Sequence, residues 1–151
     1  MHIRCFTNYK LNPNIFMKKT VLLALMCLFA LAVTAQAQVK DRVEVVYFHG
    51  KQRCATCMAI EKYAREVVNQ DFAEEQKSGK VVFKVVDIST AEGKKLAKDY
   101  RVTWSSLFIN NRKGGKEQRG NMTEFSFKNA RNNTDEFKKG VRDKIKALLK
   151  Q

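Results

Sequence analysis

The feature that most constrains this chain is the stretch from Val43 to Val68, where an apolar run leads through a short polar loop to two cysteines. The run is rich in β-branched and aromatic residues, as expected for a strand. After Cys54 and Cys57, apolar residues recur at the spacing of an amphipathic helix. The order of strand, loop, cysteine pair and helix therefore places two thiols at the N-terminus of a helix.

This placement predicts redox chemistry. A thiol at a helix N-terminus faces unpaired backbone N–H groups, which stabilise its thiolate and lower its pKa below the free value of about 8.5. We expect Cys54 to be that nucleophile. Cys57 lies three residues further on, close enough to form a disulfide and to resolve a mixed disulfide. Arg53 directly precedes the pair, and its cation favours the Cys54 thiolate or attracts an anionic substrate.

The N-terminal part of the chain has the order of a secretory signal. Met17 opens a short basic segment, an apolar run follows from Val21 to Val33, and small and polar residues come next. The apolar run is shorter than the ~20 residues that a membrane-spanning helix needs, so we predict cleavage, between Ala37 and Gln38. Residues before Met17 are interpreted as an upstream extension, and the protein is predicted to be periplasmic or otherwise exported.

Cleavage changes the number of cysteines. Residues 1–37 contain Cys5 and Cys27, so the predicted domain, residues 38–151, keeps only Cys54 and Cys57. An exported protein meets an oxidising compartment, where such a pair can be a purely structural disulfide. A ring that closes only two intervening residues restricts the unfolded chain little, however, and stabilises a fold weakly. A redox role is therefore favoured over a disulfide that only braces the loop.

The net charge of the chain limits which classes of partner it can be expected to bind. The formal net charge is +14, which first suggests nucleic acid. No basic cluster alternates with exposed aromatic residues, so we predict no nucleic-acid partner and only weak attraction to anionic partners or a membrane surface. We expect a monomer whose partner is a protein thiol or disulfide, without a cofactor.

The rest of the chain alternates strands and helices, which is typical of an α/β fold. The Val81–Val86 run is apolar except for Lys84 and rich in β-branched residues, as in a central strand covered on both faces. Phe125 and Phe127 alternate with polar residues, as in a strand. The predicted elements are strands at Val81–Val86 and Leu107–Ile109, a turn at Asn110–Lys116, a second hairpin arm within Glu117–Phe127, and helices at Glu92–Tyr100 and Asp135–Lys150.

This order resembles the thioredoxin superfamily over nearly the whole of residues 38–151. The resemblance implies a three-layer α/β/α sandwich with a central mixed sheet, and thiol–disulfide oxidoreductase activity. The segments Y-F-H-G-K-Q-R-C-A-T-C, V-T-W-S-S-L-F and E-F-S-F-K-N-A-R-N look more narrowly like exported bacterial thioredoxin-like proteins labelled nitrophenyl-compound nitroreductase subunits of the ArsF type. That label implies an accessory redox subunit of a larger reductase.

Three positions depart from the thioredoxin pattern. Arg53 stands where the family has a tryptophan, and Tyr47 stands where it has a buried acid. Ser106 takes the place of the family's cis-proline, since the only proline is Pro13. A cis bond before a non-proline residue costs roughly 2.5–4 kcal/mol, so this bond is either trans or held under strain. The resemblance implies that the backbone of Ser105 and Ser106 positions the substrate chain.

Two further residues complete the predicted site. Trp104 lies between polar residues and is predicted to form a lid beside the cysteines, and His49 is predicted to carry protons near them. The alternative function is binding of a soft metal or metalloid, such as arsenite or copper(I), by Cys54, Cys57 and His49 without turnover. The favoured hypothesis includes no metal, with catalytic residues Cys54, Cys57 and Arg53, and substrate-binding residues Trp104, Ser105, Ser106 and His49.

Overall fold

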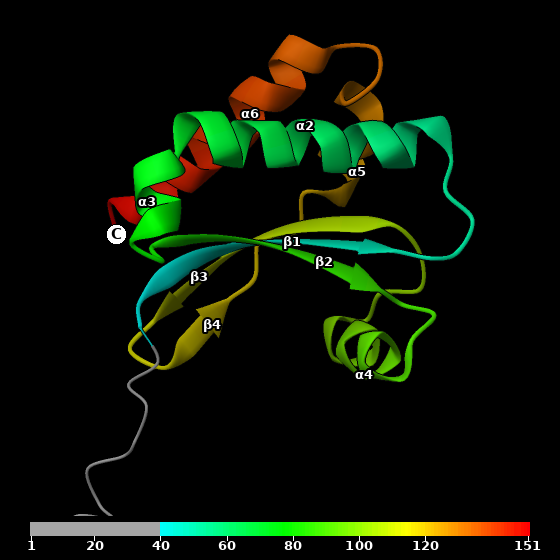
Figure 1. The fold of residues 1–151 in the computed structure, drawn as a ribbon, viewed down its shortest axis with the longest axis horizontal. Coiled ribbons are helices and arrows are strands. Elements are labelled where there is room, and N and C mark those ends of the chain that lie inside the picture. Colours follow the sequence, from blue (N-terminus) through cyan, green and yellow to red (C-terminus); the bar gives the residue numbers. More distant parts are fainter. Residues whose placement is uncertain (1–39) are drawn as a thin grey trace, which may run out of the picture. The chain divides into compact units, whose positions relative to one another are not determined.

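The computed structural model describes residues 40–151, so the predicted signal and its cleavage site lie outside the described residues. Figure 1 shows the order of the elements along the chain. The elements are β1 (Arg42–His49), α2 (Ala55–Asp71), α3 (Ala73–Lys77), β2 (Val81–Asp87), α4 (Ala91–Tyr100), β3 (Ser106–Lys113), β4 (Lys116–Gln118), α5 (Thr123–Asn129) and α6 (Thr134–Leu149). Among residues 40–151, no helix has the length and apolar character needed to cross a membrane.

The four strands form one mixed sheet in the order β2-β1-β3-β4. β1 runs parallel to β2, with Val43 opposite Val81, and antiparallel to β3, with Val43 opposite Asn111. Helices α2, α5 and α6 cover one face of the sheet, and α4 covers part of the other (Figure 1). The prediction of a thioredoxin-like α/β/α sandwich with a mixed sheet is confirmed.

The position predicted for the Val81–Val86 strand is wrong. This segment is β2, an edge strand, and β1 is the strand with neighbours on both sides. All residues of β1 from Val43 to Phe48 are buried, whereas Val85 of β2 is 38% exposed. A nearly continuous apolar run indicates a strand with partial cover on both faces, but it does not say whether one or two strands flank it.

The alternation of β1 builds two separate cores. Val43, Val45 and Tyr47 point to the larger core, which includes Ile60 of α2 and Phe137 of α6. The intervening residues Val46 and Phe48 point to a smaller core on the other face, with Phe108 of β3 and Ala97 and Tyr100 of α4. Because side chains alternate along a strand, β1 anchors helices on both faces and fixes the loop that follows it.

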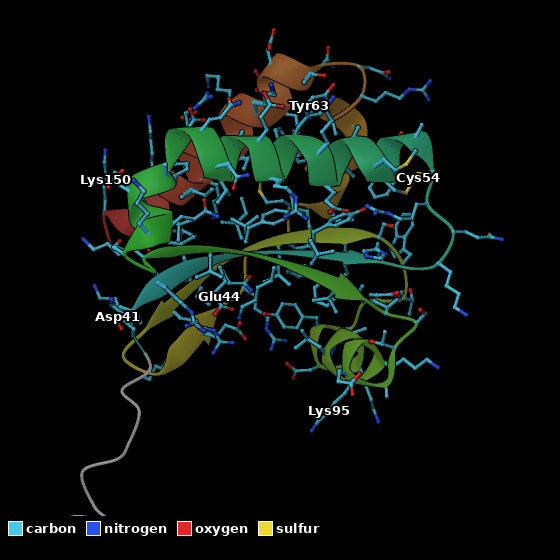
Figure 2. All side chains as sticks on the ribbon, viewed as in Figure 1. Asp41, Glu44, Cys54, Tyr63, Lys95 and Lys150 are labelled. Atoms are coloured by element: carbon cyan, nitrogen blue, oxygen red, sulfur yellow. A yellow bond between two sulfur atoms is a disulfide. The ribbon has the colours of Figure 1, made fainter. Side chains whose placement is uncertain are left out.

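The α4 face of the sheet carries charge where the helix does not cover it. Glu44 points to this face and is only 1% exposed, near the label in Figure 2. Its carboxylate accepts hydrogen bonds from Arg42 at 2.6 Å and Lys84 at 2.9 Å, and lies 3.1 Å from Arg112. Burial alone raises the pKa of Glu44, but these cations outweigh burial and hold its pKa below the ordinary value.

The region after the hairpin differs from the prediction. β4 contains only Lys116–Gln118, and Phe125 and Phe127 belong to helix α5. Residues two apart on a helix project about 200° from each other, so they face different neighbours. Phe125 stacks on Phe137 with ring centroids 6.3 Å apart, and Phe127 stacks on Trp104 at 5.2 Å. The alternation of aromatic and polar residues therefore arises because one short helix contacts Phe137 on one side and Trp104 on another.

Candidate active site

The two cysteines lie at the start of α2, directly after the loop that connects it to β1. They form a disulfide, with Cα atoms 5.0 Å apart, which Figure 2 shows beside the label of Cys54. The two residues differ in accessibility, because Cys54 is exposed while Cys57 is 7% exposed. An incoming sulfur can therefore reach Cys54 and is kept from Cys57.

Cys54 is the N-cap of α2. Its backbone is extended, with φ −75° and ψ 164°, and its sulfur accepts a hydrogen bond from the backbone N–H of Cys57 at 3.1 Å. Serine, threonine and aspartate usually supply the acceptor at this position. The first turn of α2 contains no acidic residue. The sulfur thus occupies the place where a helix favours negative charge, without a competing carboxylate in that turn.

Tyr47 lies beneath the cysteine pair, at the position where the thioredoxin pattern has a buried acid. It is fully buried, and its hydroxyl donates a hydrogen bond of 2.7 Å to the backbone carbonyl of Cys57. A phenol that donates to a carbonyl holds the first turn of α2 against β1. It supplies no carboxylate to take the proton of Cys57, so proton transfer at this thiol needs another acceptor, such as water.

The side chain of Arg53 extends along α2 towards Glu61. Its guanidinium forms an ion pair with Glu61 and lies 5.7 Å from the ring centroid of Tyr47. Glu61 also accepts a 2.7 Å hydrogen bond from Arg65. Burial raises the pKa of Glu61, but the bonds from Arg65 and Arg53 outweigh it, and the pKa lies below its ordinary value. Glu61 therefore stays ionised and offsets part of the charge of Arg53.

One hollow of about 750 Å³ brings most of the predicted site together. The predicted residues that line it are Arg53, Cys54, Cys57, Trp104 and Ser105. Trp104 is 61% exposed and lies over Phe127, which lines the same hollow. The sequence reasoning did not include Phe127, since it placed this residue in a strand.

The bond before Ser106 is trans, because residues 40–151 contain no cis peptide bond. Ser106 is the first residue of β3, pairs with Phe48, and donates its hydroxyl to the carbonyl of Trp104 at 3.2 Å. Ser106 lines the hollow next to the cysteine site, on the other side of Trp104. Ser105 is 7% exposed, and its backbone has no hydrogen bond to another backbone group within the described part of the chain.

His49 is not among the residues that line the cysteine hollow. Its ring stacks on Tyr47 with centroids 6.2 Å apart, and its Nδ1 lies 3.0 Å from the carbonyl of Gly50. The three-ligand arrangement proposed for the alternative function, with Cys54, Cys57 and His49, is not found. Among residues 40–151, no three or more His, Cys, Asp and Glu residues form a group that could hold a metal ion.

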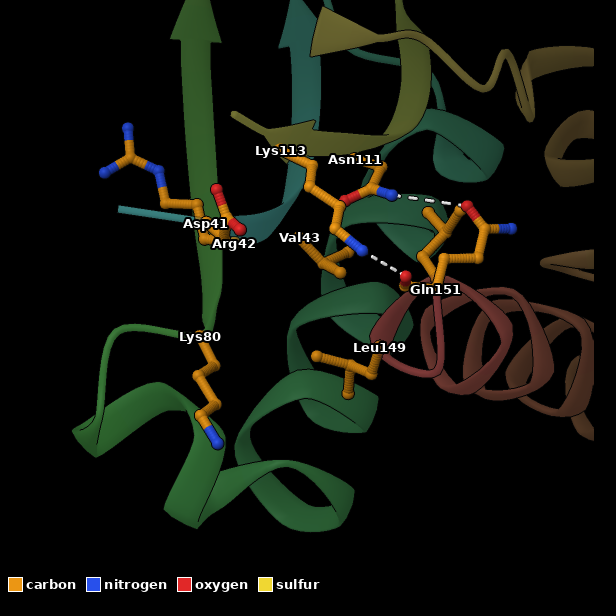
Figure 3. Close-up of a pocket in the computed structure, with 9 residues that line it drawn as sticks. Asp41, Arg42, Val43, Lys80, Asn111, Lys113, Leu149 and Gln151 are labelled. Carbon is orange, nitrogen blue, oxygen red and sulfur yellow. Dashed lines mark hydrogen bonds between the residues drawn. The ribbon is translucent and has the colours of Figure 1, made fainter. Parts of the chain in front are cut away.

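A smaller hollow of about 220 Å³ lies at the other end of β1 (Figure 3). The last residue, Gln151, closes one side of it by accepting hydrogen bonds from Lys113 and, at 3.3 Å, from Asn111. Figure 3 also shows Lys80 and Leu149 at its rim. It contains none of the predicted site residues, so the cysteine hollow is the candidate active site.

Known proteins share only limited similarity with this chain. No family model matches the chain, and no curated protein matches its sequence, so neither supports the narrower ArsF-type resemblance. The structure is similar to a Thermus thermophilus thioredoxin (25% identity over 68% of this chain and 72% of that chain, TM-score 0.46). It is also similar to Fasciola hepatica thioredoxin (26% identity over 59% of this chain and 77% of that chain, TM-score 0.33). A malarial protein is similar as well (16% identity over 66% of this chain and 97% of that chain, TM-score 0.39). The chain's own order of strands and helices, with a disulfide at the start of the helix that follows β1, is that of a thioredoxin-like fold.

Proposed function

We propose that this protein exchanges thiols and disulfides with a protein partner through Cys54 and Cys57. The observation that carries the proposal is the difference between the two sulfurs. Cys54 is exposed at the N-cap of a 17-residue helix and accepts the N–H of Cys57, whereas Cys57 is buried behind it. An accessible sulfur with a stabilised negative charge attacks well and also leaves well.

In the reducing direction, the Cys54 thiolate attacks one sulfur of a partner disulfide. A bond forms between Cys54 and that sulfur, and the other partner sulfur leaves as a thiolate that takes a proton from water. Cys57 then loses its proton to water and attacks the sulfur of Cys54, which releases the second partner thiol and forms the Cys54–Cys57 disulfide. Two electrons pass to the partner, and the reverse sequence oxidises a partner dithiol.

The partner segment is proposed to bind along Ser105. Two residues further on, Leu107 donates its N–H to the hydroxyl of Thr123 at 3.2 Å, and its carbonyl accepts the N–H of Met122 at 2.8 Å. Alternate residues of a strand direct their backbone groups to the same side, so Ser105 faces the side of Leu107 that lies away from β1. Its unpaired backbone groups suit an extended partner segment, with Trp104 as an exposed apolar contact beside it.

We infer further that the protein works after export, on the strength of the basic, apolar and small-residue order from Met17 to Ala37. An accessory role in a larger reductase, as the ArsF-type resemblance implies, uses the same exchange chemistry. N-terminal sequencing of the protein from a fractionated host tests export. A start at Gln38 in an exported fraction supports it, and an intact N-terminus in the cytosol contradicts it.

A trapping experiment tests the proposed exchange. In Cys57→Ser the mixed disulfide on Cys54 cannot be resolved, so a covalent adduct should accumulate and disappear when dithiothreitol is added. Cys54→Ser is the matched control, since it keeps one thiol, the buried one, and should trap little. Equal adducts in both variants, or none in Cys57→Ser, would contradict the proposal. Stoichiometric arsenite or copper(I) binding without insulin reduction would favour the binding alternative.

A further inference from the structure

Three cations lie on the flank of α4 beside the candidate active site. Lys94, Lys98 and Arg101, here called the α4 cationic stripe, are all exposed and line one hollow of about 560 Å³. They stand four and three residues apart, so they lie along one side of the helix and its C-terminal end. α4 covers the opposite face of the sheet from α2 (Figure 1). It lies near the carboxyl end of β1, which is also the end of the sheet where α2 begins.

The stripe is not neutralised within the described part of the chain. Arg53, Arg112 and Arg119 each contact a carboxylate, but no carboxylate forms an ion pair with Lys94, Lys98 or Arg101 among residues 40–151. The acid next to Lys98, Asp99, is bound by Arg119 instead. Like charges four residues apart on a helix repel each other. The stripe therefore carries a cost in the isolated protein that an anionic partner would remove.

The backbone of Arg101 adds a second observation. Arg101 has φ 55° and ψ 42°, the left-handed conformation, and is the only non-glycine residue with positive φ among residues 40–151. It ends α4 by donating its N–H to the carbonyls of Ala97 and Lys98. Glycine adopts this conformation with less strain. A long cationic side chain thus occupies a position that the backbone alone would assign to glycine.

The stripe hollow adjoins the cysteine hollow directly. Ile88 and Thr103 line both, and so form the wall between them. Arg101 also lines the hollow that contains Ser106, and Trp104 lines both that hollow and the cysteine hollow. A polypeptide bound at Cys54 and Ser105 therefore has the stripe within reach of the residues that flank its own cysteine.

We propose that the partner of this protein carries acidic residues beside its reactive cysteine and that the α4 cationic stripe binds them. This inference rests on the proposed thiol exchange and names the chemistry of the partner surface. The floor of the stripe hollow is Ala97 and Val102, which are buried apolar residues. A concave site with an apolar floor and cationic rim fits the side chains of an acidic polypeptide better than a flat layer of lipid headgroups.

Peptide disulfides test the proposal. Two peptides of equal length carry one cysteine as a disulfide with thionitrobenzoate, flanked by glutamates in one and by glutamines in the other. Attack by Cys54 forms the peptide mixed disulfide and releases the coloured thiolate, which gives a rate constant. We expect the acidic peptide to react about tenfold faster at low salt, and less than about twofold faster in ~0.5 M NaCl.

The same ratio should fall below about twofold in Lys94→Gln/Lys98→Gln/Arg101→Gly, because the attracting charges are gone. Glycine at position 101 relieves the backbone, so this variant should fold, as circular dichroism can verify. The control Lys80→Gln/Lys146→Gln/Lys150→Gln removes the same charge from the residue before β2, from α6 and from the C-cap of α6, and should keep the ratio. A ratio unchanged in the first variant, or lowered equally in both, would overturn the inference.

Three other outcomes also decide the question. If the wild-type protein reacts equally with both peptides but binds phosphatidylglycerol vesicles through the stripe, the partner is a membrane surface and the inference is wrong. If the reduced wild-type protein reacts with neither peptide, the proposed exchange function itself fails, and the inference fails with it. A normal rate with the neutral peptide and no preference for the acidic one contradicts the inference alone.

Discussion

The ion pair of Arg53 with Glu61 limits how much positive charge Arg53 presents to Cys54. Arg53 directly precedes the cysteine, but its guanidinium is held by Glu61, which lies two turns further along the helix. Arg65 shares the same carboxylate at 2.7 Å. Opposite charges that close together largely cancel at a distance, so the helix N-terminus, rather than Arg53, should make the larger contribution to the Cys54 thiolate.

Replacing either member of this ion pair should change the reactivity of Cys54, in opposite directions. Glu61→Gln frees the field of Arg53 and should increase the rate at which iodoacetamide alkylates Cys54 at pH 7, by about twofold. Arg53→Gln leaves Glu61 with Arg65 and should lower the rate by a similar factor. The double variant should lie between them. Rates that change in the same direction for both single variants would contradict this electrostatic account.

At the scale of elements, the close approach of α4 to the end of β2 fixes the wall of the active site. Gly93 in the first turn of α4 is buried, and a Cβ atom there would lie 1.8 Å from the carbonyl oxygen of Asp87. The loop between Asp87 and Gly93 includes Ile88, which lines both the cysteine hollow and the stripe hollow. Only glycine allows the helix to pack this close.

Gly93→Ala should therefore destabilise the protein, even though alanine favours helices over glycine by up to about 1 kcal/mol. The backbone must move to relieve the clash, and we expect a net loss of about 1–3 kcal/mol in the free energy of unfolding in urea. Gly50→Ala is a suitable control, since its nearest neighbour would be 4.0 Å away and its cost should stay within about 0.5 kcal/mol. A Gly93→Ala protein as stable as wild type would show that α4 shifts freely.

Local sequence patterns predicted most of the elements but not how they pair. The periodicity of α2, α4 and α6 and the apolar strands are local signals, so their existence and approximate bounds were predictable. The edge position of β2 depends on which strands pair with β1, which its own residues do not encode. α5 was missed because Phe125 and Phe127 serve two different neighbours, Phe137 and Trp104, from one short helix.

The candidate site was predictable where chain order alone brings residues together. Arg53, Cys54 and Cys57 are close together in sequence, the polar neighbours of Trp104 suggested that it lies beside them, and the resemblance to thioredoxins added Ser105. Phe127 joins the hollow from α5, a helix that the sequence reasoning did not foresee. The pairing of Arg53 with Glu61 depends on side-chain conformations, which residue spacing does not determine.

At the scale of the whole molecule, the buried carboxylate of Glu44 links three of the four strands. Arg42 lies on the same strand, Lys84 comes from β2 and Arg112 from β3, and Glu117 of β4 accepts a 3.0 Å hydrogen bond from Arg112. A polar residue in an apolar strand ordinarily faces solvent. Here the half of the sheet that α4 leaves uncovered is held by ion pairs, with an ionised carboxylate at their centre.

This network makes stability depend on pH. The folded pKa of Glu44 lies below the ordinary value of 4.5, so its stabilising contribution is complete above that pH and is lost as the pH falls through the folded pKa. Glu44→Gln should lower the free energy of unfolding by about 2 kcal/mol at pH 7, because the three cations around position 44 lose the carboxylate that they share. The variant should also lose less stability on acidification than wild type, as urea unfolding at pH 7 and pH 3.5 can measure.

Glu74→Gln is the matched control for this prediction. Glu74 pairs with Lys77 on the surface, where both side chains are largely exposed. Its replacement should change the free energy of unfolding by less than about 0.5 kcal/mol at either pH. Equal losses in the two variants at pH 7 would mean that the Glu44 network contributes no more than a surface ion pair.

The measurement that most directly tests the central claim is the rate of iodoacetamide alkylation of Cys54 as a function of pH, made on Cys57→Ser so that only one thiol reacts. The N-cap position and the hydrogen bond from the N–H of residue 57 predict a half-maximal rate below about pH 7.5, since a helix N-terminus stabilises the thiolate. A half-maximal rate at about pH 8.5 or above, the value of a free thiol, would contradict the account.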